Sequence, residues 1–272
     1  MVMALLPTVV FAEGEQAQWG IAGDDGSAPM TWEGNGDLAA AMNYANGLDE
    51  GNIAYIQLLG DINKDNHTTW PLNFNSGKTT ILDLNGKNID RGLTSSVASI
   101  SGHVIAVGGD LTLKDSSSSA NGKITGGNTN TTYYSCGGVY VEENGKFTML
   151  SGNITGNKGQ TGGGVFVGSN GNFEMQGGNI TDNLASAGAG VYVNNIGILT
   201  MKGGNITGNT AVNGGGVYIG WSNPKFGLFN MQGGSIADNV AKNGGGVYNG
   251  GDLTITGGSI TRNKSEMNIR GG

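Results

Sequence analysis

The chain has 272 residues and a net charge of −7, and only 13% of its residues are charged. Glycine contributes 53 residues without a strict three-residue period, which excludes collagen and leaves a low-complexity chain or a turn-rich repeat array. Lys and Arg form no basic stripe, so we expect no nucleic-acid partner, since phosphate binding needs clustered cations. The single cysteine, Cys136, excludes an intrachain disulfide.

The N-terminus predicts the end of a secretory signal peptide. Residues 1–11 are largely apolar, and Val10 and Ala12 are small residues at the two positions that signal peptidase reads. A charged n-region is missing, so we interpret residues 1–12 as a signal-peptide remnant; a short buried strand is the alternative. The apolar stretch is too short to span a bilayer, and we expect no membrane span elsewhere.

Residues 13–34 are expected to form a linker, and residues 35–60 an N-terminal cap. Within the cap, Asp37 is predicted to begin a helix that runs to about Asn46, with Gly47 as a C-cap candidate. The apolar stripe of this helix comprises Leu38, Ala41, Met42 and Ala45. The helix is expected to cover the end of a repeat array, because an open end exposes core and strand edges.

Residues 137–263 repeat one glycine-rich unit of about 26 residues five times. Rows of equivalent residues define the unit. The valine row is Val139, Val165, Val191, Val217 and Val247; the methionine row is Met149, Met175, Met201, Met231 and Ile255; the isoleucine row is Ile154, Ile180, Ile206, Ile236 and Ile260; the asparagine row is Asn157, Asn183, Asn209, Asn239 and Asn263. Four extra residues in one unit indicate a loop insertion at residues 221–226.

Each unit contains three strand signals, such as residues 165–167, 173–175 and 179–181, in which apolar and polar residues alternate. Glycine-rich turns between them leave no room for a crossover helix. The sequence therefore predicts an all-β fold, a right-handed parallel β-helix over residues 35–272 with three short strands per coil. Equivalent positions would then stack about 4.8 Å apart.

The asparagine row is interpreted as a stacked amide ladder, because asparagine tolerates left-handed backbone and bonds to local backbone groups; a polar binding row is the alternative. Cys136 falls where later repeats have glycine, and we interpret it as a tolerated small residue. Upstream coils are expected to be looser, with loops at residues 116–119 and 126–135. The array remains open at Gly272, which suggests one segment of a longer protein.

The entry segment, with Tyr55–Ile62 and Ile81–Ile89, resembles that of pectin-lyase-like right-handed β-helices. Repeats such as Gly177–Asn183 and Gly214–Tyr218 are similar to those of bacterial cell-surface proteins, adhesins and polymorphic outer-membrane proteins. The resemblance covers about residues 35–270. It implies the fold, but such coils carry enzymes, adhesins and passive stalks alike.

The pattern of acidic residues does not favour catalysis. Family enzymes use clustered aspartates, or calcium-binding acids with a basic residue. Here Asp182 and Asp238 share one row two coils apart, and no third acid joins them, so we interpret them as turn residues. His67 and His103 are isolated, and no cluster has metal-ligand spacing. We therefore expect no catalytic residue, no metal and no cofactor.

Alternation along the first strand of each unit predicts an outward aromatic ladder. Its members are Tyr140, Phe166, Tyr192, Tyr218 and Tyr248. Such a ladder would bind sugar rings or apolar side chains, or it would only stack on itself and stabilise the sheet; we favour the second reading. Trp221 and Phe226 mark a possible loop site in the insertion. Outward Asn and Thr rows beside the isoleucines would suit ice binding, although Ala237 interrupts them.

These patterns predict a non-enzymatic, extracellular segment of a bacterial surface protein, secreted or displayed on the cell. It would act as a stalk or adhesive module whose partners are glycans or host or cell-surface proteins. A polysaccharide lyase or hydrolase is the alternative, and an ice-binding protein is a weaker third hypothesis.

Overall fold

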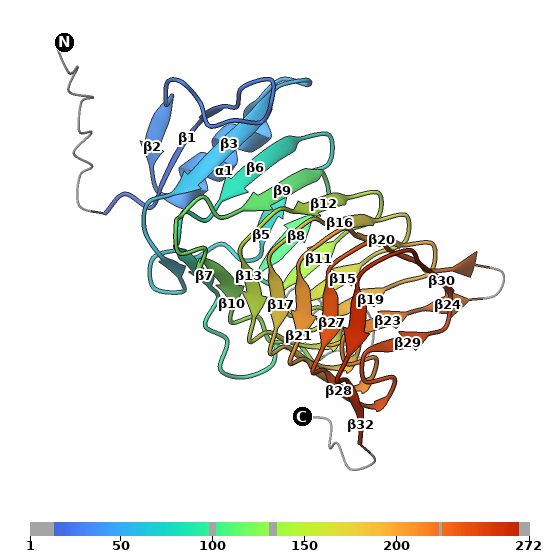
Figure 1. The fold of residues 1–272 in the computed structure, drawn as a ribbon. Coiled ribbons are helices and arrows are strands. Elements are labelled where there is room, and N and C mark those ends of the chain that lie inside the picture. Colours follow the sequence, from blue (N-terminus) through green and yellow to red (C-terminus); the bar gives the residue numbers. More distant parts are fainter. Residues whose placement is uncertain (1–13, 98–101, 131–134, 223–224, 267–272) are drawn as a thin grey trace, which may run out of the picture.

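In the computed structural model, described residues span 14–97, 102–130, 135–222 and 225–266. The predicted signal-peptide remnant lies outside these residues. The chain winds as a parallel β-solenoid of about eight coils with about 26 residues per coil, as predicted (Figure 1). Equivalent strands of successive coils pair in parallel; Val165, for example, pairs with Val139 and Val191.

Four parallel sheets run along the solenoid, and each is named here for its inward residues in the regular coils. The valine sheet comprises β5 (Leu72–Phe74), β8 (Ile105–Val107), β11 (Val139–Val141), β15 (Val165–Val167), β19 (Val191–Val193), β23 (Val217–Ile219) and β29 (Val247–Asn249). The methionine sheet comprises β2 (Gly34–Gly36), β1 (Ala17–Ile21), β3 (Ile53–Leu58), β6 (Thr79–Asp83), β9 (Asp110–Lys114), β12 (Lys146–Met149), β16 (Asn172–Met175), β20 (Ile198–Met201), β26 (Leu228–Met231) and β30 (Asp252–Ile255); in it β1 pairs antiparallel with both β2 and β3.

The isoleucine sheet comprises β4 (Ile62–Asn63), β7 (Asn88–Asp90), β10 (Lys123–Thr125), β13 (Asn153–Thr155), β17 (Asn179–Thr181), β21 (Asn205–Thr207), β27 (Ser235–Ala237) and β31 (Ser259–Thr261). The alanine sheet comprises β14 (Lys158–Thr161), β18 (Leu184–Ala187), β22 (Thr210–Asn213), β28 (Val240–Asn243) and β32 (Lys264–Ser265). A two-stranded hairpin, β24 (Trp221–Ser222) and β25 (Lys225–Phe226), completes the strands.

The alanine sheet corrects the prediction of three strands per coil, because the regular coils have four. The three predicted strands are present, and the fourth follows the asparagine row. Its buried inward residues are Ala185, Ala211 and Ala241, which form an apolar cluster of their own with Ala189. Such small side chains give little hydrophobic contrast with their neighbours, so the alternation that marks a strand is weak.

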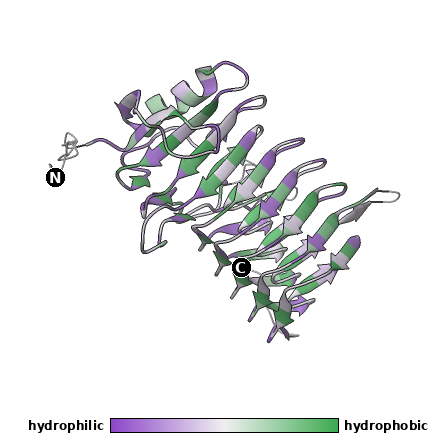
Figure 2. Ribbon diagram, turned by 45° about the horizontal axis from the view of Figure 1, so that its top comes forward, coloured by the Kyte–Doolittle hydropathy of each residue, from purple (hydrophilic) through white to green (hydrophobic). Residues whose placement is uncertain are grey.

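The main core is filled by stacked rows of large apolar side chains. In the central coil, Val191, Leu199, Met201 and Ile206 are all fully buried. The methionine side chains also explain why glycine recurs at the position of Gly204 in successive coils. A Cβ atom at Gly204 would lie only 2.6 Å from Cε of Met175. Hydrophobic residues accordingly concentrate in the strands and hydrophilic ones at many of the turns (Figure 2).

The buried asparagine row forms the amide ladder that its spacing predicts. Nδ2 of Asn183 donates to the carbonyl oxygen of Ile154 and to Oδ1 of Asn209, each at 3.0 Å. The backbone N of Asn183 donates to the same Oδ1, also at 3.0 Å. The left-handed backbone lies one residue earlier than expected, at Asp182 with φ 55° and Gly208 with φ 69°. Asparagine is therefore required here for its side-chain hydrogen bonds.

The predicted N-terminal helix is α1 (Leu38–Gly47), and Oδ1 of Asp37 accepts a hydrogen bond from Ala40 N at 2.7 Å. All four residues of the predicted stripe are buried, and they join the main core. Gly47 is the last helical residue and Leu48 the C-cap. Within the described ranges, no helix has the length and apolar character needed to cross a membrane.

The segment expected to be a linker carries β1, which joins the methionine sheet beside β3. Ala17 in this strand is fully buried, whereas Ile21 at its end is exposed. A strand this short, with a glycine at Gly20, gives no clear alternation in the sequence. The segment forms a strand because it pairs antiparallel with β3, a tertiary contact that the local sequence does not reveal.

Two buried carboxylates fasten the turn at residues 115–122. Asp115 accepts hydrogen bonds from Gly122 N at 2.7 Å and from Gly86 N at 2.8 Å, and also from the Ser117 hydroxyl. Asp83 accepts one from Ser116 N at 2.9 Å. Burial opposes ionisation of Asp115, but these hydrogen bonds outweigh it and hold the pKa of Asp115 below its usual range.

We predict that Asn183→Ala lowers the free energy of unfolding by about 2–4 kcal/mol, because it leaves several buried partners unsatisfied. Chemical denaturation of the whole chain measures the change. The matched control is Asn179→Ala in the half-buried row of β17, where the expected loss is below about 1 kcal/mol. Equal losses in the two variants would contradict the special role of the buried ladder.

We also predict an acid-sensitive contribution from Asp115. A lowered folded-state pKa means that stability is present above the unfolded value of about 4 and is lost as the pH falls through the folded value. The Asp115→Asn variant should be less stable at neutral pH and should lose less melting temperature between about pH 7 and pH 3. Asp252→Asn, at an exposed site, is the matched control, and an equal change in the two variants would contradict the role of the buried Asp115.

Candidate functional site

The aromatic ladder forms on the valine sheet as a continuous ring stack. Successive ring centroids from Tyr140 to Tyr248 lie 4.8–5.2 Å apart, and the interplanar angles fall from 25° at the first pair to 1° at the last. His103 lies next to the first ring, with its ring centroid 5.3 Å from that of Tyr140 and its plane tilted by 37°. The in-register pairing of β11, β15, β19, β23 and β29 imposes this geometry.

Because each ring stacks on the next, the flat faces of the inner rings are occupied within the ladder. Phe166, expected to point to solvent, is fully buried, while the four tyrosines are half-buried. Burial, and then the neighbouring Tyr248, raises the pKa of Tyr218 above its usual range. A sugar ring can therefore contact the edges of these tyrosines, but the faces of the inner aromatic rings are not open for it to stack on.

The insertion at residues 221–226 forms a hairpin that carries two exposed aromatic residues. Trp221 is 60% exposed and Phe226 44% exposed, and the two residues are cross-strand partners. The base of the hairpin is closed by a hydrogen bond from Gly227 N to Gly220 O at 2.9 Å. A second, from Ile196 N to Phe226 O at 2.9 Å, joins the hairpin to the preceding coil.

The indole of Trp221 rests on the following coil. A Cβ atom at Gly250 would lie 2.8 Å from Cδ1 of Trp221, so glycine is required where the ring meets the backbone. Trp221 thus contacts one coil with part of its ring while more than half of its surface remains open. The two residues of the predicted loop site thus lie across the hairpin from each other, and Trp221 is held against Gly250.

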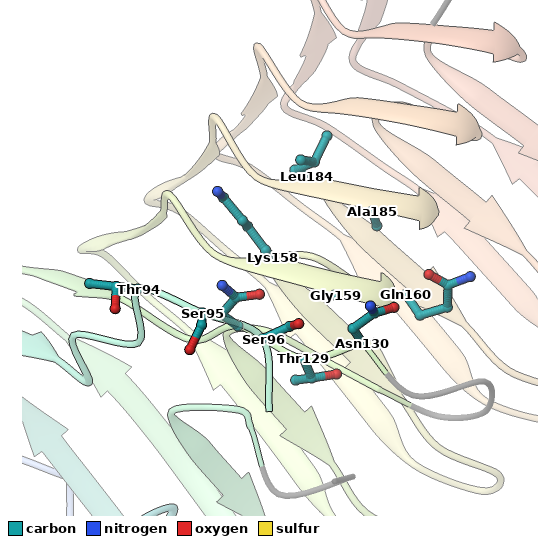
Figure 3. A pocket seen from close by; sticks show the side chains of 11 residues that line it. Thr94, Ser95, Ser96, Thr129, Asn130, Lys158, Gly159, Gln160, Leu184 and Ala185 are labelled. Atoms are coloured by element: carbon teal, nitrogen blue, oxygen red, sulfur yellow. The ribbon is translucent and has the colours of Figure 1, made fainter. Parts of the chain in front are cut away.

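A polar pocket of about 220 Å³, which the sequence analysis missed, lies at the N-terminal end of the alanine sheet (Figure 3). Four separate segments line it: residues 94–96, residues 128–130, and the beginnings of β14 and β18. The loop at residues 126–135 gave a partial signal, since it departs from the repeat. The remaining wall depends on the fourth strand, which the alternation pattern does not reveal.

Of the two acids that share a row, Asp238 is paired with a cation, and so is Glu174 on a neighbouring sheet. Asp238 forms a bidentate ion pair with Arg262, at 2.8 Å to Nε and 2.7 Å to Nη2, and this bonding lowers the pKa of Asp238. Glu174 lies 2.9 Å from Nζ of Lys202, whose hydrogen bond lowers the pKa of Glu174. A general acid at neutral pH needs the opposite shift. Among the described residues, no group of three His, Cys, Asp or Glu side chains is placed to hold a metal.

On the outer face of the isoleucine sheet, Asn and Thr side chains form hydrogen bonds with their equivalents in the next coil. Asn179 donates to Asn153 at 2.9 Å, and the hydroxyl of Thr181 donates to that of Thr155 at 3.2 Å. Ala237 is buried at the interruption of the row. Cys136 is also buried; desolvation raises the pKa of its thiol, which donates to Val139 O at 3.1 Å.

Comparison with known proteins assigns no relative. No family model, no curated protein and no solved structure matches the chain.

We predict that Tyr218→Ala lowers the free energy of unfolding by about 2–4 kcal/mol, since it removes two ring contacts and the apolar area buried between them. Tyr218→Phe keeps the ring and should change stability by less than about 1 kcal/mol. Denaturation of both variants measures the difference. A Phe variant as unstable as the Ala variant would show that the hydroxyl, and not the stack, matters.

Proposed function

We propose that this chain is a non-enzymatic segment of a bacterial surface protein, a rigid stalk that carries an adhesive contact outside the cell. We further propose that its solenoid belongs to the pectin-lyase-like class of right-handed β-helices found in adhesins. The residues that support this class are the entry segment and the glycine-rich repeats. The localisation rests on the apolar, small-residue pattern of residues 1–12.

The observation that carries the adhesive role is the exposure of Trp221. Large aromatic side chains are normally buried, and an exposed one on a rigid framework is typical of an interaction site. Trp221 supplies a wide apolar surface at low conformational cost, because its ring already rests against Gly250. Phe226 lies beside it as its cross-strand partner. Such a platform suits the apolar face of a sugar ring or an apolar side chain of a partner protein.

The neighbouring chemistry supports binding without turnover. Asp238, one of the two acids that share a row, is bonded to Arg262, and Glu174 is bonded to Lys202. Their lowered pKa values suit ionised residues in ion pairs and do not suit a general acid. The solenoid would then serve to hold the hairpin at a fixed position on a long, stiff support.

Binding to a glycan and mucin array tests the proposal. We expect the unchanged chain to bind a subset of ligands and Trp221→Ala to lose most of that signal, about tenfold or more, as for a central aromatic contact. Leu150→Ala is the matched control, because Leu150 is also exposed, at 40%, but lies away from the hairpin. Binding that survives Trp221→Ala and Phe226→Ala together would contradict the adhesive role of the hairpin.

Incubation with polygalacturonate and related glycans tests the non-enzymatic part separately. We expect no new unsaturated or reducing ends in a product assay. Their appearance would overturn this part of the proposal and support the polysaccharide-active alternative.

A further inference from the structure

Ile196 has a backbone conformation that its side chain disfavours. Its φ is 55°, in the left-handed region, whereas the equivalent turn residues of the two preceding coils are Asn144 at 63° and Asn170 at 57°. Asparagine tolerates this conformation, but a β-branched residue in it is strained. The turn itself would therefore be more stable with asparagine, and the isoleucine side chain points to a role other than folding.

The strained residue lies beside the Trp221 hairpin. Asn170 N donates to Ile196 O at 3.2 Å, and Ile196 N donates to Phe226 O at 2.9 Å. Because the same hydrogen bond recurs from coil to coil, Phe226 follows Ile196 along the solenoid as Ile196 follows Asn170. Trp221 is the cross-strand partner of Phe226. Ile196 and the two exposed aromatic residues are thus neighbours at one turn.

Apolar residues also replace polar ones on the adjoining strands. The first outward position of the methionine sheet reads, from β12 to β30, Lys146, Asn172, Ile198, Leu228 and Asp252. The two apolar members, Ile198 and Leu228, are partly exposed, and they belong to the coil before the hairpin and to the coil that carries it. Leu228 N donates to Gly197 O at 2.9 Å, which joins this row to the turn of Ile196.

These residues form an apolar patch that is too small for a stable dimer. The hairpin patch, as we call it, comprises Ile196, Ile198, Trp221, Phe226 and Leu228. With Trp221 60% and Phe226 44% exposed and the other three partly exposed, it offers roughly 300–400 Å² of apolar surface. A stable interface buries about 800 Å² on each partner, so the patch suits a short segment of another protein and not a second copy of this chain.

The side chains and the charge around the patch narrow the partner further. Isoleucine and leucine lack the flat face that stacks on a sugar ring, and they favour a polypeptide. Asp252, next to Leu228, is exposed and forms no ion pair among the described residues. This carboxylate, in a chain with a net charge of −7, opposes an anionic membrane surface and attracts a cationic group.

We propose that the hairpin patch docks a short segment of a partner protein, in which apolar side chains lie beside a lysine or an arginine. The apolar side chains cover Trp221, Phe226 and the aliphatic residues, and the cation faces Asp252. The inference rests on the adhesive role proposed above for the hairpin, and it narrows the ligand to a polypeptide. Signal on a glycan and mucin array would then come from mucin polypeptide and not from free glycans.

Selection of short random peptides displayed on phage tests this proposal with the whole chain. We expect enrichment of peptides that combine Leu, Ile, Phe or Trp with a neighbouring Lys or Arg. The most enriched peptide is then synthesised and titrated by calorimetry. Trp221→Ala should lower its affinity about tenfold or more and Asp252→Asn about threefold. Leu150→Ala, at an exposed site away from the hairpin, should leave the affinity unchanged.

Ile196→Asn separates a binding role from a structural one. Asparagine relieves the strain at this turn, so the melting temperature should rise by about 2–4 °C while the affinity for the peptide falls about fivefold. The matched control is Asn170→Ile, which introduces the same strain one coil earlier at an exposed position. It should lower the melting temperature and leave the affinity unchanged. Unchanged affinity in Ile196→Asn would overturn the proposal.

The failure of this inference is distinguishable from the failure of the adhesive role. If no peptide is enriched but free glycans bind and Trp221→Ala abolishes that binding, the adhesive role stands and the polypeptide partner is wrong. If neither peptides nor array ligands bind, both proposals fail. Enriched peptides without cations, or an affinity that Asp252→Asn does not lower, would overturn the charge assigned to the partner.

Discussion

In-register parallel pairing between coils is the constraint on which the rest of this structure depends. It places each residue directly over its equivalent, as Ile180 lies over Ile154. Every row must therefore consist of side chains that pack well against copies of themselves. Branched apolar residues meet this condition by interdigitation, and aromatic rings meet it by stacking.

The same constraint selects asparagine for the buried polar row. Its amide both donates and accepts, so one residue can bond to the next along the axis without any other partner. Asn209 does so at 3.0 Å to Asn239, as Asn183 does to Asn209. A buried aspartate row would place like charges one strand spacing apart, which is unfavourable. In the regular coils Asp238 lies instead at the turn just before this row, where it meets Arg262.

Much of the fold could be predicted from the sequence because the period is explicit. Rows such as Met149 and Met175 reveal the coil length, and the stripe on Leu38 reveals the helix. The fourth strand could not be predicted, since alanine and glycine carry little apolar contrast. The stacking that covers the faces of the tyrosine rings could not be predicted either. It depends on how each ring is rotated, and the alternation along a strand does not specify that rotation. The pocket depends on a backbone contact between Thr129 and Lys158 in successive coils. The sequence does not reveal this pairing, because the loop at residues 126–135 interrupts the repeat.

The direction of the inter-coil hydrogen bonds has a mechanical consequence. These bonds run from coil to coil, parallel to the solenoid axis, as those from Asn205 N to Gly178 O and from Ser235 N to Gly204 O do. Tension applied along the axis therefore loads them lengthwise, and the coil nearest the pulled end carries the load first. Each coil contacts only its neighbours, so extension would proceed by peeling coils away in sequence. A chain built in this way would lengthen stepwise under force, releasing about one repeat of slack at a time.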